Sequence, residues 1–234
     1  MLPVGDSTRR RRVPYVNVAI ILACVAVFVY ELTLTGAGVN EFFYDFGVVP
    51  TRLIDWLEDP SGLDEPSTVV TSMFVHGGWL HLIGNMLYLW VFGDNVEDAM
   101  GHVRYPIFYL LCGAGAAALQ VFVDQDSIVP MVGASGAIAG VLGAYLVLFP
   151  RATVSVVIPL LFFFGAFPVP AAVLIVFWFL LQLMSGVASL GTATGVSEGI
   201  AFWAHVGGFI TGAALIFVFR SGRPRRRPPE QTVQ

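Results

Sequence analysis

Long apolar stretches separated by short polar segments dominate the chain. Several of these stretches approach the roughly 20 residues that a helix needs to cross a bilayer. They cover residues 16–34, 79–95, 105–123, 133–149, 169–187 and 200–219. The pattern therefore predicts an all-α polytopic membrane protein with six transmembrane helices.

Two segments could change this number of spans. The first stretch follows an Arg run as a signal peptide would, but its apolar run is long and no clear A-x-A cleavage site follows, so we expect a retained helix. The apolar region from 153 to 187 is long enough for two helices, yet Pro159, Pro168 and Pro170 interrupt it, and helices usually end before a proline. We therefore expect an interfacial or re-entrant segment over 153–167 and a single span after it.

Composition agrees with a membrane setting. The 234 residues are 56% hydrophobic and 12% charged, with a mean hydropathy of +0.78. So few charges leave no polar surface for a soluble domain. The long segment between the first two spans, residues 35–78, is acidic and contains amphipathic pieces. We expect it to be an external loop that lies partly on the outer leaflet.

The positive charges predict the orientation of the chain. All twelve basic residues are Arg, and the net charge is −4. If both termini are cytoplasmic, eleven of the twelve lie inside and Arg52 alone lies outside, as the positive-inside rule requires. Residues 1–15 then form a cytoplasmic tail, 16–219 the membrane domain and 220–234 a basic cytoplasmic tail. Beside a membrane, that basic tail is expected to touch anionic lipid rather than nucleic acid.

Four polar side chains are predicted at a similar depth in the outer half of the bilayer. The second, fourth and sixth spans all run from outside to inside in this topology. His81 and Asn85 lie one turn apart on one face of the second span, Ser135 near the outer end of the fourth, and His205 a few residues into the sixth. Polar groups in hydrocarbon are costly, so we expect them to have a function.

Small residues give the fourth and sixth spans a way to approach each other. Gly136 and Gly140 have G-x-x-x-G spacing, and Ala204, Gly208 and Gly212 recur at intervals of four. Such stripes allow close contact between helix backbones in lipid. Close packing would bring the two polar residues of these spans within hydrogen-bonding reach.

A serine beside a histidine base is an arrangement for nucleophilic acyl transfer. The two spans contain no carboxylate, so we expect a Ser135–His205 dyad, with Glu198 as a less favoured group to orient the imidazole. Acyl transfer also needs hydrogen-bond donors where negative charge develops. Asn85, His81 and the backbone N–H of Ser135 suit that oxyanion site.

The same residues resemble those of the rhomboid family of intramembrane serine proteases. The resemblance lies in "TSMFVHGGWLHLIGNMLYLWVFGDNVED", "GASGAIAG" and "AHVGGFITG", in this order. It implies a six-helix core with Ser135 as nucleophile, His205 as base, Asn85 and His81 in the oxyanion site, and His76 at the outer edge of the cavity.

Two positions depart from the family pattern. Many members have a Tyr four residues after the serine, stacking on the catalytic histidine, whereas this chain has Ala139. The Trp-Arg pair common in the first external loop is also missing, and Arg52 and Trp56 are its nearest candidates. The first departure leaves the orientation of His205 without an assigned partner.

The sequence thus favours an endopeptidase that cleaves single-span membrane proteins near the outer ends of their helices, without metal or cofactor. An inactive rhomboid-like protein that binds transmembrane helices is the alternative, although such proteins typically lack the serine or the histidine. A transporter would place paired ionisable groups at the midplane, and a zinc protease would carry H-E-x-x-H. The Arg-only basic content and the lack of an organelle presequence favour a prokaryotic plasma membrane; no pattern specifies an oligomeric state.

Overall fold

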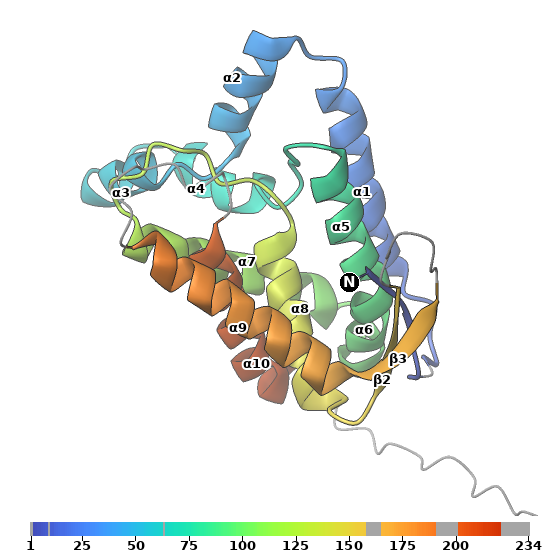
Figure 1. Cartoon of the computed structure of the whole chain (residues 1–234). Helices are drawn as coiled ribbons and strands as arrows, with labels where there is room; N and C mark the ends of the chain where they lie inside the picture. The colour runs from blue at the N-terminus through green and yellow to red at the C-terminus, as the bar shows by residue number, and fades with distance from the viewer. Residues whose placement is uncertain (1, 9, 63, 158–164, 191–200, 221–234) are drawn as a thin grey trace, which may run out of the picture.

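The computed structural model describes residues 2–8, 10–62, 64–157, 165–190 and 201–220, which are mostly helical (Figure 1). The helices, including one π-helical segment η1, are α1 (Tyr15–Glu31), α2 (Gly36–Phe46), α3 (Pro50–Glu58), α4 (Asp64–Thr71), α5 (Trp79–Tyr88), η1 (Leu89–Gly93), α6 (Asp94–Met100), α7 (Arg104–Val123), α8 (Ser135–Leu148), α9 (Ala171–Ser189) and α10 (Phe202–Phe219). The strands are β1 (Leu2–Asp6), β2 (Thr153–Val157) and β3 (Ala166–Pro170). The basic tail and Glu198, both considered above, lie largely or wholly outside the described residues.

Helices occupy each of the six apolar stretches. By length and composition, α7, α9 and α10 could each cross a membrane, while α1 and α8 are apolar but shorter. In the second stretch, α5, η1 and α6 follow one another without a break. At the start of the wider turn of η1, the buried Asn17 of α1 donates from Nδ2 to the Leu89 carbonyl (2.9 Å). A side chain from a neighbouring helix thus holds a carbonyl where the regular ladder changes.

An antiparallel three-stranded sheet, in the order β1-β2-β3, corrects the prediction of an exclusively helical fold. β1 comes from the expected N-terminal tail. β2 lies at the start of the expected interfacial segment 153–167 and β3 begins at its end, while residues 158–164 between them are not described. Val154 and Val156 of β2 are fully buried and alternate with more exposed neighbours. Pairing with β1 satisfies backbone groups that an isolated interfacial segment would leave to solvent.

The backbones of α8 and α10 meet along the predicted small-residue stripes. A Cβ added at Gly208 would overlap the carbonyl of Gly136, and one added at Gly212 would overlap the backbone of Gly140. α7 packs against both helices: a Cβ on Gly207 of α10 would lie 2.6 Å from the Gly115 carbonyl oxygen, and one on Gly136 of α8 would lie 2.6 Å from Ala116 Cβ. The expected close approach of these two helices is therefore present, and it fixes where their first turns lie relative to each other.

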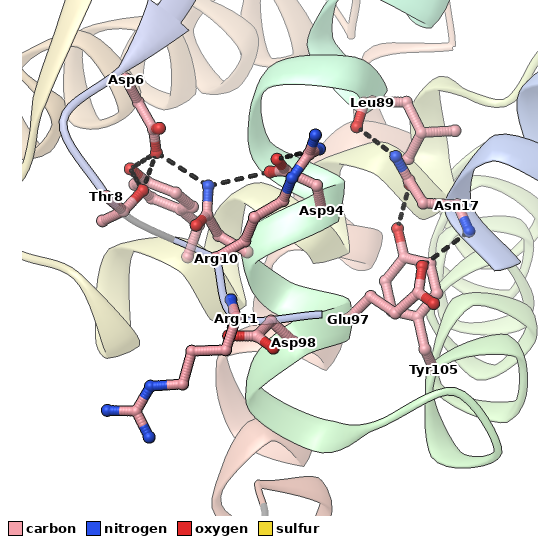
Figure 2. A network of polar contacts seen from close by, with 12 residues as sticks. Asp6, Thr8, Arg10, Arg11, Asn17, Leu89, Asp94, Glu97, Asp98 and Tyr105 are labelled. Carbon is pink, nitrogen blue, oxygen red and sulfur yellow. Dashed lines mark hydrogen bonds and ion pairs between the residues drawn. The ribbon is translucent and has the colours of Figure 1, made fainter. Parts of the chain in front are cut away.

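A polar network holds the N-terminal segment and α1 against α6 (Figure 2). Glu97, fully buried, accepts the backbone N–H groups of Val16 (3.2 Å) and Asn17 (2.7 Å), which are unpaired donors at the start of α1. Arg10 pairs with Asp94 at 3.1 Å. The network thus attaches α1 and the segment before it to the end of the helix that begins with α5.

The same network reaches α8 at its far end. Asp6 accepts hydrogen bonds from Tyr145 of α8 and from Asn95 of α6. Tyr145 lies ten residues after Ser135, or roughly 15 Å along the helix. The network therefore holds α8 in place without contributing to the end that carries the serine.

Candidate active site

Ser135 is the first residue of α8 and follows a tightly constrained turn. Gly133 has φ +125°, a conformation that favours glycine, and its N–H donates to the Ser72 carbonyl (2.8 Å). Two residues earlier, Met131 forms a β-bridge with Val48. The approach to Ser135 is thus attached to the loop before α3 and to the end of α4. The backbone N–H of Ser135 is one of the first-turn donors that have no partner within the helix.

His205 lies in the first turn of α10, and its Nε2 is 2.7 Å from the hydroxyl oxygen of Ser135. The Gly208–Gly136 contact explains this short distance, since it brings the two helix backbones together one turn away. From α7, Gln120 Oε1 accepts the N–H of Ala204 (3.2 Å) and so caps the start of α10. The structure therefore brings the predicted nucleophile and base into direct contact.

The other ring nitrogen of His205 has a partner that the sequence analysis missed. Its Nδ1 lies 2.8 Å from Oε1 of Gln182 on α9. The ring of Trp178, one turn earlier on α9, is 5.7 Å from the imidazole between centroids, with a 45° tilt. The signal was present, because Gln182 is the single amide or charged residue in the apolar run 171–189. Ala139, where the family often has Tyr, is fully buried within α8.

His81 and Asn85 on α5 face the turn before Ser135. A Cβ added at Gly133 would lie 2.6 Å from His81 Nε2 and 3.7 Å from Asn85 Nδ2. His81 Nδ1 accepts the N–H of Gly77 (3.4 Å), which leaves Nε2 as the protonated nitrogen. The buried Nδ2 of Asn85 has no hydrogen-bond partner among the residues that the structure describes. Two donors thus point toward the same small space.

His76, in the loop before α5, does not lie at the outer edge of the cavity as the resemblance implied. Its side chain is fully buried, its Nδ1 donates to the Phe74 carbonyl (3.1 Å), and its ring packs edge-on against His81 at 5.2 Å. Glu31 of α1 accepts its backbone N–H (3.1 Å). Burial, together with the neighbouring His81, lowers the pKa of His76 to about 4, so the ring is neutral and supports His81 from behind.

The candidate residues open onto one cavity of about 770 Å³. Ser135, His205, His81, Asn85 and Gln182 all contribute to its walls. This volume is within the range of pockets that bind small molecules or side chains.

The two loop residues compared with the family's Trp-Arg pair are not part of that cavity. Arg52 donates to the Tyr44 carbonyl (2.7 Å) and pairs with Glu65, and Trp56 donates to the Ser61 carbonyl (3.1 Å). These contacts are internal to the segment that carries α2, α3 and α4.

Comparison with known proteins decides the family. Residues 64–222, which include every candidate residue of the cavity named above, match the Rhomboid domain profile. The chain belongs to the rhomboid family. Among its rhomboid relatives is RHOMBOID-like protein 6, mitochondrial, of Arabidopsis thaliana, to which the chain is 30% identical over 197 residues. The aligned region covers 83% of this chain and 57% of that protein. It is 34% identical over 150 residues to RHOMBOID-like protein 2 of the same plant, covering 64% and 41%.

A yeast rhomboid gives a shorter match. Rhomboid protein 1, mitochondrial, of Saccharomyces cerevisiae is 32% identical over 114 residues, covering 47% of this chain and 31% of that protein. The chain thus spans between about a third and just over half of the length of these three relatives.

The expectation of a prokaryotic plasma membrane is wrong. The rhomboid relatives described above are eukaryotic, and two of them are named mitochondrial. The expectation rested on the Arg-only basic content and on the lack of an organelle presequence. Basic residues beside the spans report the orientation of a protein across a membrane, not the membrane in which it resides.

Proposed function

We propose that this rhomboid is an intramembrane serine endopeptidase whose nucleophile is Ser135 and whose general base is His205. The observation that carries the proposal is the 2.7 Å contact between the Ser135 hydroxyl and His205 Nε2 inside a cavity. Family membership supports it independently. A six-span topology with both termini cytoplasmic belongs to the same proposal, supported by the placement of the Arg residues and by helices in all six apolar stretches.

The reaction follows from the two reacting groups. The Ser135 oxygen attacks the carbonyl carbon of the scissile peptide bond while His205 Nε2 takes the hydroxyl proton. When the tetrahedral intermediate collapses, the C–N bond breaks, and His205 gives this proton to the leaving nitrogen. Water then attacks the acyl-Ser135 ester and gives a proton to His205, which returns it to the serine oxygen as the carboxylic acid product leaves.

The negative charge of the tetrahedral intermediate would be stabilised by Asn85 Nδ2, His81 Nε2 and the Ser135 N–H. Asn85 Nδ2 supports this role because it is a buried donor without a partner among the described residues, a costly arrangement unless something else binds there. His81 supports it because the Gly77 N–H selects the tautomer with its proton on Nε2.

We expect Asn85→Ala to lower kcat by about 10²–10³-fold with little change in KM, since it removes one oxyanion donor. The measurement is steady-state cleavage of a transmembrane substrate in detergent and in vesicles. Gln125→Ala, which shortens an exposed amide side chain in the loop after α7, is the matched control and should leave both constants unchanged. An Asn85→Ala enzyme with normal kcat would assign Asn85 to packing alone.

In the proposed topology, Ser135, His205 and Asn85 lie in the outer half of the bilayer. The substrate would then be a single membrane-spanning helix cut near its outer end. A helix hides its carbonyls in internal hydrogen bonds, and lipid offers no replacement for them. Local unwinding of the substrate must therefore precede attack by Ser135.

We expect cleavage to cluster near the outer end of a model substrate and to increase where Gly weakens the helix, because Gly costs about 1 kcal/mol relative to Ala. Gly pairs would be placed at successive depths, with Ala pairs as controls, and each cut mapped by mass spectrometry. Cuts near the cytoplasmic end, or equal cleavage of the Gly and Ala series, would contradict this placement.

A serine-directed phosphonate distinguishes the proposal from its alternatives. It should label wild-type protein at Ser135, and a metal chelator should not prevent labelling. A rhomboid-like protein that only binds helices, a transporter and a zinc protease would not give this result.

A further inference from the structure

The imidazole of His205 is held at both nitrogens, and its second partner comes from α9. Nε2 faces the Ser135 hydroxyl at 2.7 Å, and Nδ1 faces Gln182 Oε1 at 2.8 Å. We propose that Gln182 is a positioning residue, the uncharged third member of a Ser135–His205–Gln182 relay. This inference rests on the proposed function, because it assigns to Gln182 the orientation of that base.

The hydrogen-bond pattern determines which tautomer is present. A carboxamide oxygen only accepts, so the proton of a neutral His205 lies on Nδ1 and is donated to Gln182. Nε2 then carries the lone pair that can accept the Ser135 proton. In the other tautomer, Nε2–H would point at Ser135 and could not act as a base. Gln182 therefore selects the competent form before any substrate binds.

The contacts of α9 place Gln182 in register with His205. Phe179 stacks on Phe209 of α10 at 4.4 Å between ring centroids. Gly186 lies against Trp203, whose ring would be 3.2 Å from a Cβ added there. Gln182 falls between these contacts, so Phe179, Gln182 and Gly186 share the face of α9 that is directed at α10.

Trp178 supplies a second restraint from the same helix. The centroid of its ring lies 5.7 Å from that of the His205 imidazole. α8 contributes only the methyl group of Ala139 at the position where many family members have Tyr. The ring contact and the hydrogen bond both come from α9, so in this chain the base is oriented by α9 rather than by α8.

An uncharged partner also suits this location. A carboxylate at the same position would be costly to place in hydrocarbon, whereas a carboxamide offers the same acceptor oxygen without a net charge. Gln182 thus orients the imidazole and contributes a dipole when the ring becomes positive during the reaction.

We expect Gln182→Met to lower kcat by about 10²-fold with an unchanged KM, because the side chain keeps its length but loses the acceptor that orients His205. Gln182→Glu keeps an acceptor oxygen but adds a carboxyl group that is costly to place in hydrocarbon, so correctly inserted protein should recover part of the lost kcat. Gln125→Met makes the same chemical change at an exposed site and is the matched control. An unchanged kcat in Gln182→Met, or an equal loss in Gln182→Glu and Gln182→Met, would overturn the proposal.

A spectroscopic measurement separates this proposal from the function on which it rests. Nitrogen-15 NMR of histidine-labelled protein distinguishes the two neutral tautomers, and the chain has 4 His residues, so comparison with His205→Ala identifies the signal. Wild type should show His205 with its proton on Nδ1, and Gln182→Met should lose that preference. Suppose that wild-type protein neither cleaves nor reacts with a phosphonate, yet its His205 tautomer changes in Gln182→Met. This result would contradict the proposed protease function but support the contact between Gln182 and His205. An active wild-type protein whose His205 tautomer is the same in Gln182→Met would contradict only the proposed positioning role of Gln182.

Discussion

Ser135→Ala and His205→Ala should each lower kcat by on the order of 10⁶-fold, and the double variant should lose almost nothing more. The reason is the 2.7 Å contact between the two side chains. The serine hydroxyl is a weak nucleophile without a base to take its proton, and the base has no substrate-attacking partner without the serine. Groups that act as one unit give strongly non-additive losses.

The measurement is single-turnover cleavage of a transmembrane substrate by correctly inserted protein, with phosphonate labelling in parallel. Ser185→Ala, which removes a hydroxyl from α9, is the matched control and should cleave normally. Two results would contradict the proposed dyad. One is substantial cleavage by Ser135→Ala, and the other is a double variant far less active than either single one.

The contact between Ser135 and His205 could be predicted from the sequence because each of the two residues is polar within an apolar helix. Polar residues within apolar spans are rare enough that Ser135 and His205 are conspicuous. The small-residue stripes on α8 and α10 indicate that these two helices meet, as the Gly136–Gly208 contact shows. The same reasoning found His81 and Asn85. All four side chains line one cavity. The sequence analysis expected them to lie close together because the predicted direction of each span places them at a similar depth.

Gln182 carried the same kind of signal, but its role depends on how α9 is rotated about its axis. That rotation is determined by contacts with α10 such as Phe179–Phe209, which no local pattern specifies. A polar residue on α9 facing away from α10 would have looked identical in the sequence. The contact between Gln182 and His205 could therefore be identified only from the tertiary structure.

The sheet was missed for a related reason. β1 pairs residues 2–6 with residues 154–157, so its partner lies about 150 positions away in the chain. Five-residue strands such as β2 are also too short for periodicity to separate them from an interfacial segment. The positions of the helices followed from the apolar stretches along the chain, whereas this long-range strand pairing did not.

Gly212→Leu should prevent α8 and α10 from pairing and so remove both the fold and the activity, while Gly212→Ala should show the same defect in reduced form. A Cβ at Gly212 would overlap the backbone of Gly140, and backbone, unlike the end of a side chain, cannot rotate away. Forcing extra atoms into such a contact typically costs about 1–3 kcal/mol of stability for small additions. Separation of the helices by about 1 Å would also move His205 from Ser135 and cost roughly 10²-fold in rate.

The measurement for Gly212→Ala and Gly212→Leu is denaturant-induced unfolding in mild detergent, together with cleavage by the fraction that remains folded. Gly36→Ala is the matched control, since nothing lies within 4 Å of a Cβ added there, and it should unfold and cleave as wild type does. A fully stable and active Gly212→Ala protein would mean that α8 and α10 do not depend on backbone contact. A folded Gly212→Ala protein with lower kcat and unchanged KM would show that this contact positions the base relative to the serine, because substrate binding would then be intact while the chemical step is slowed.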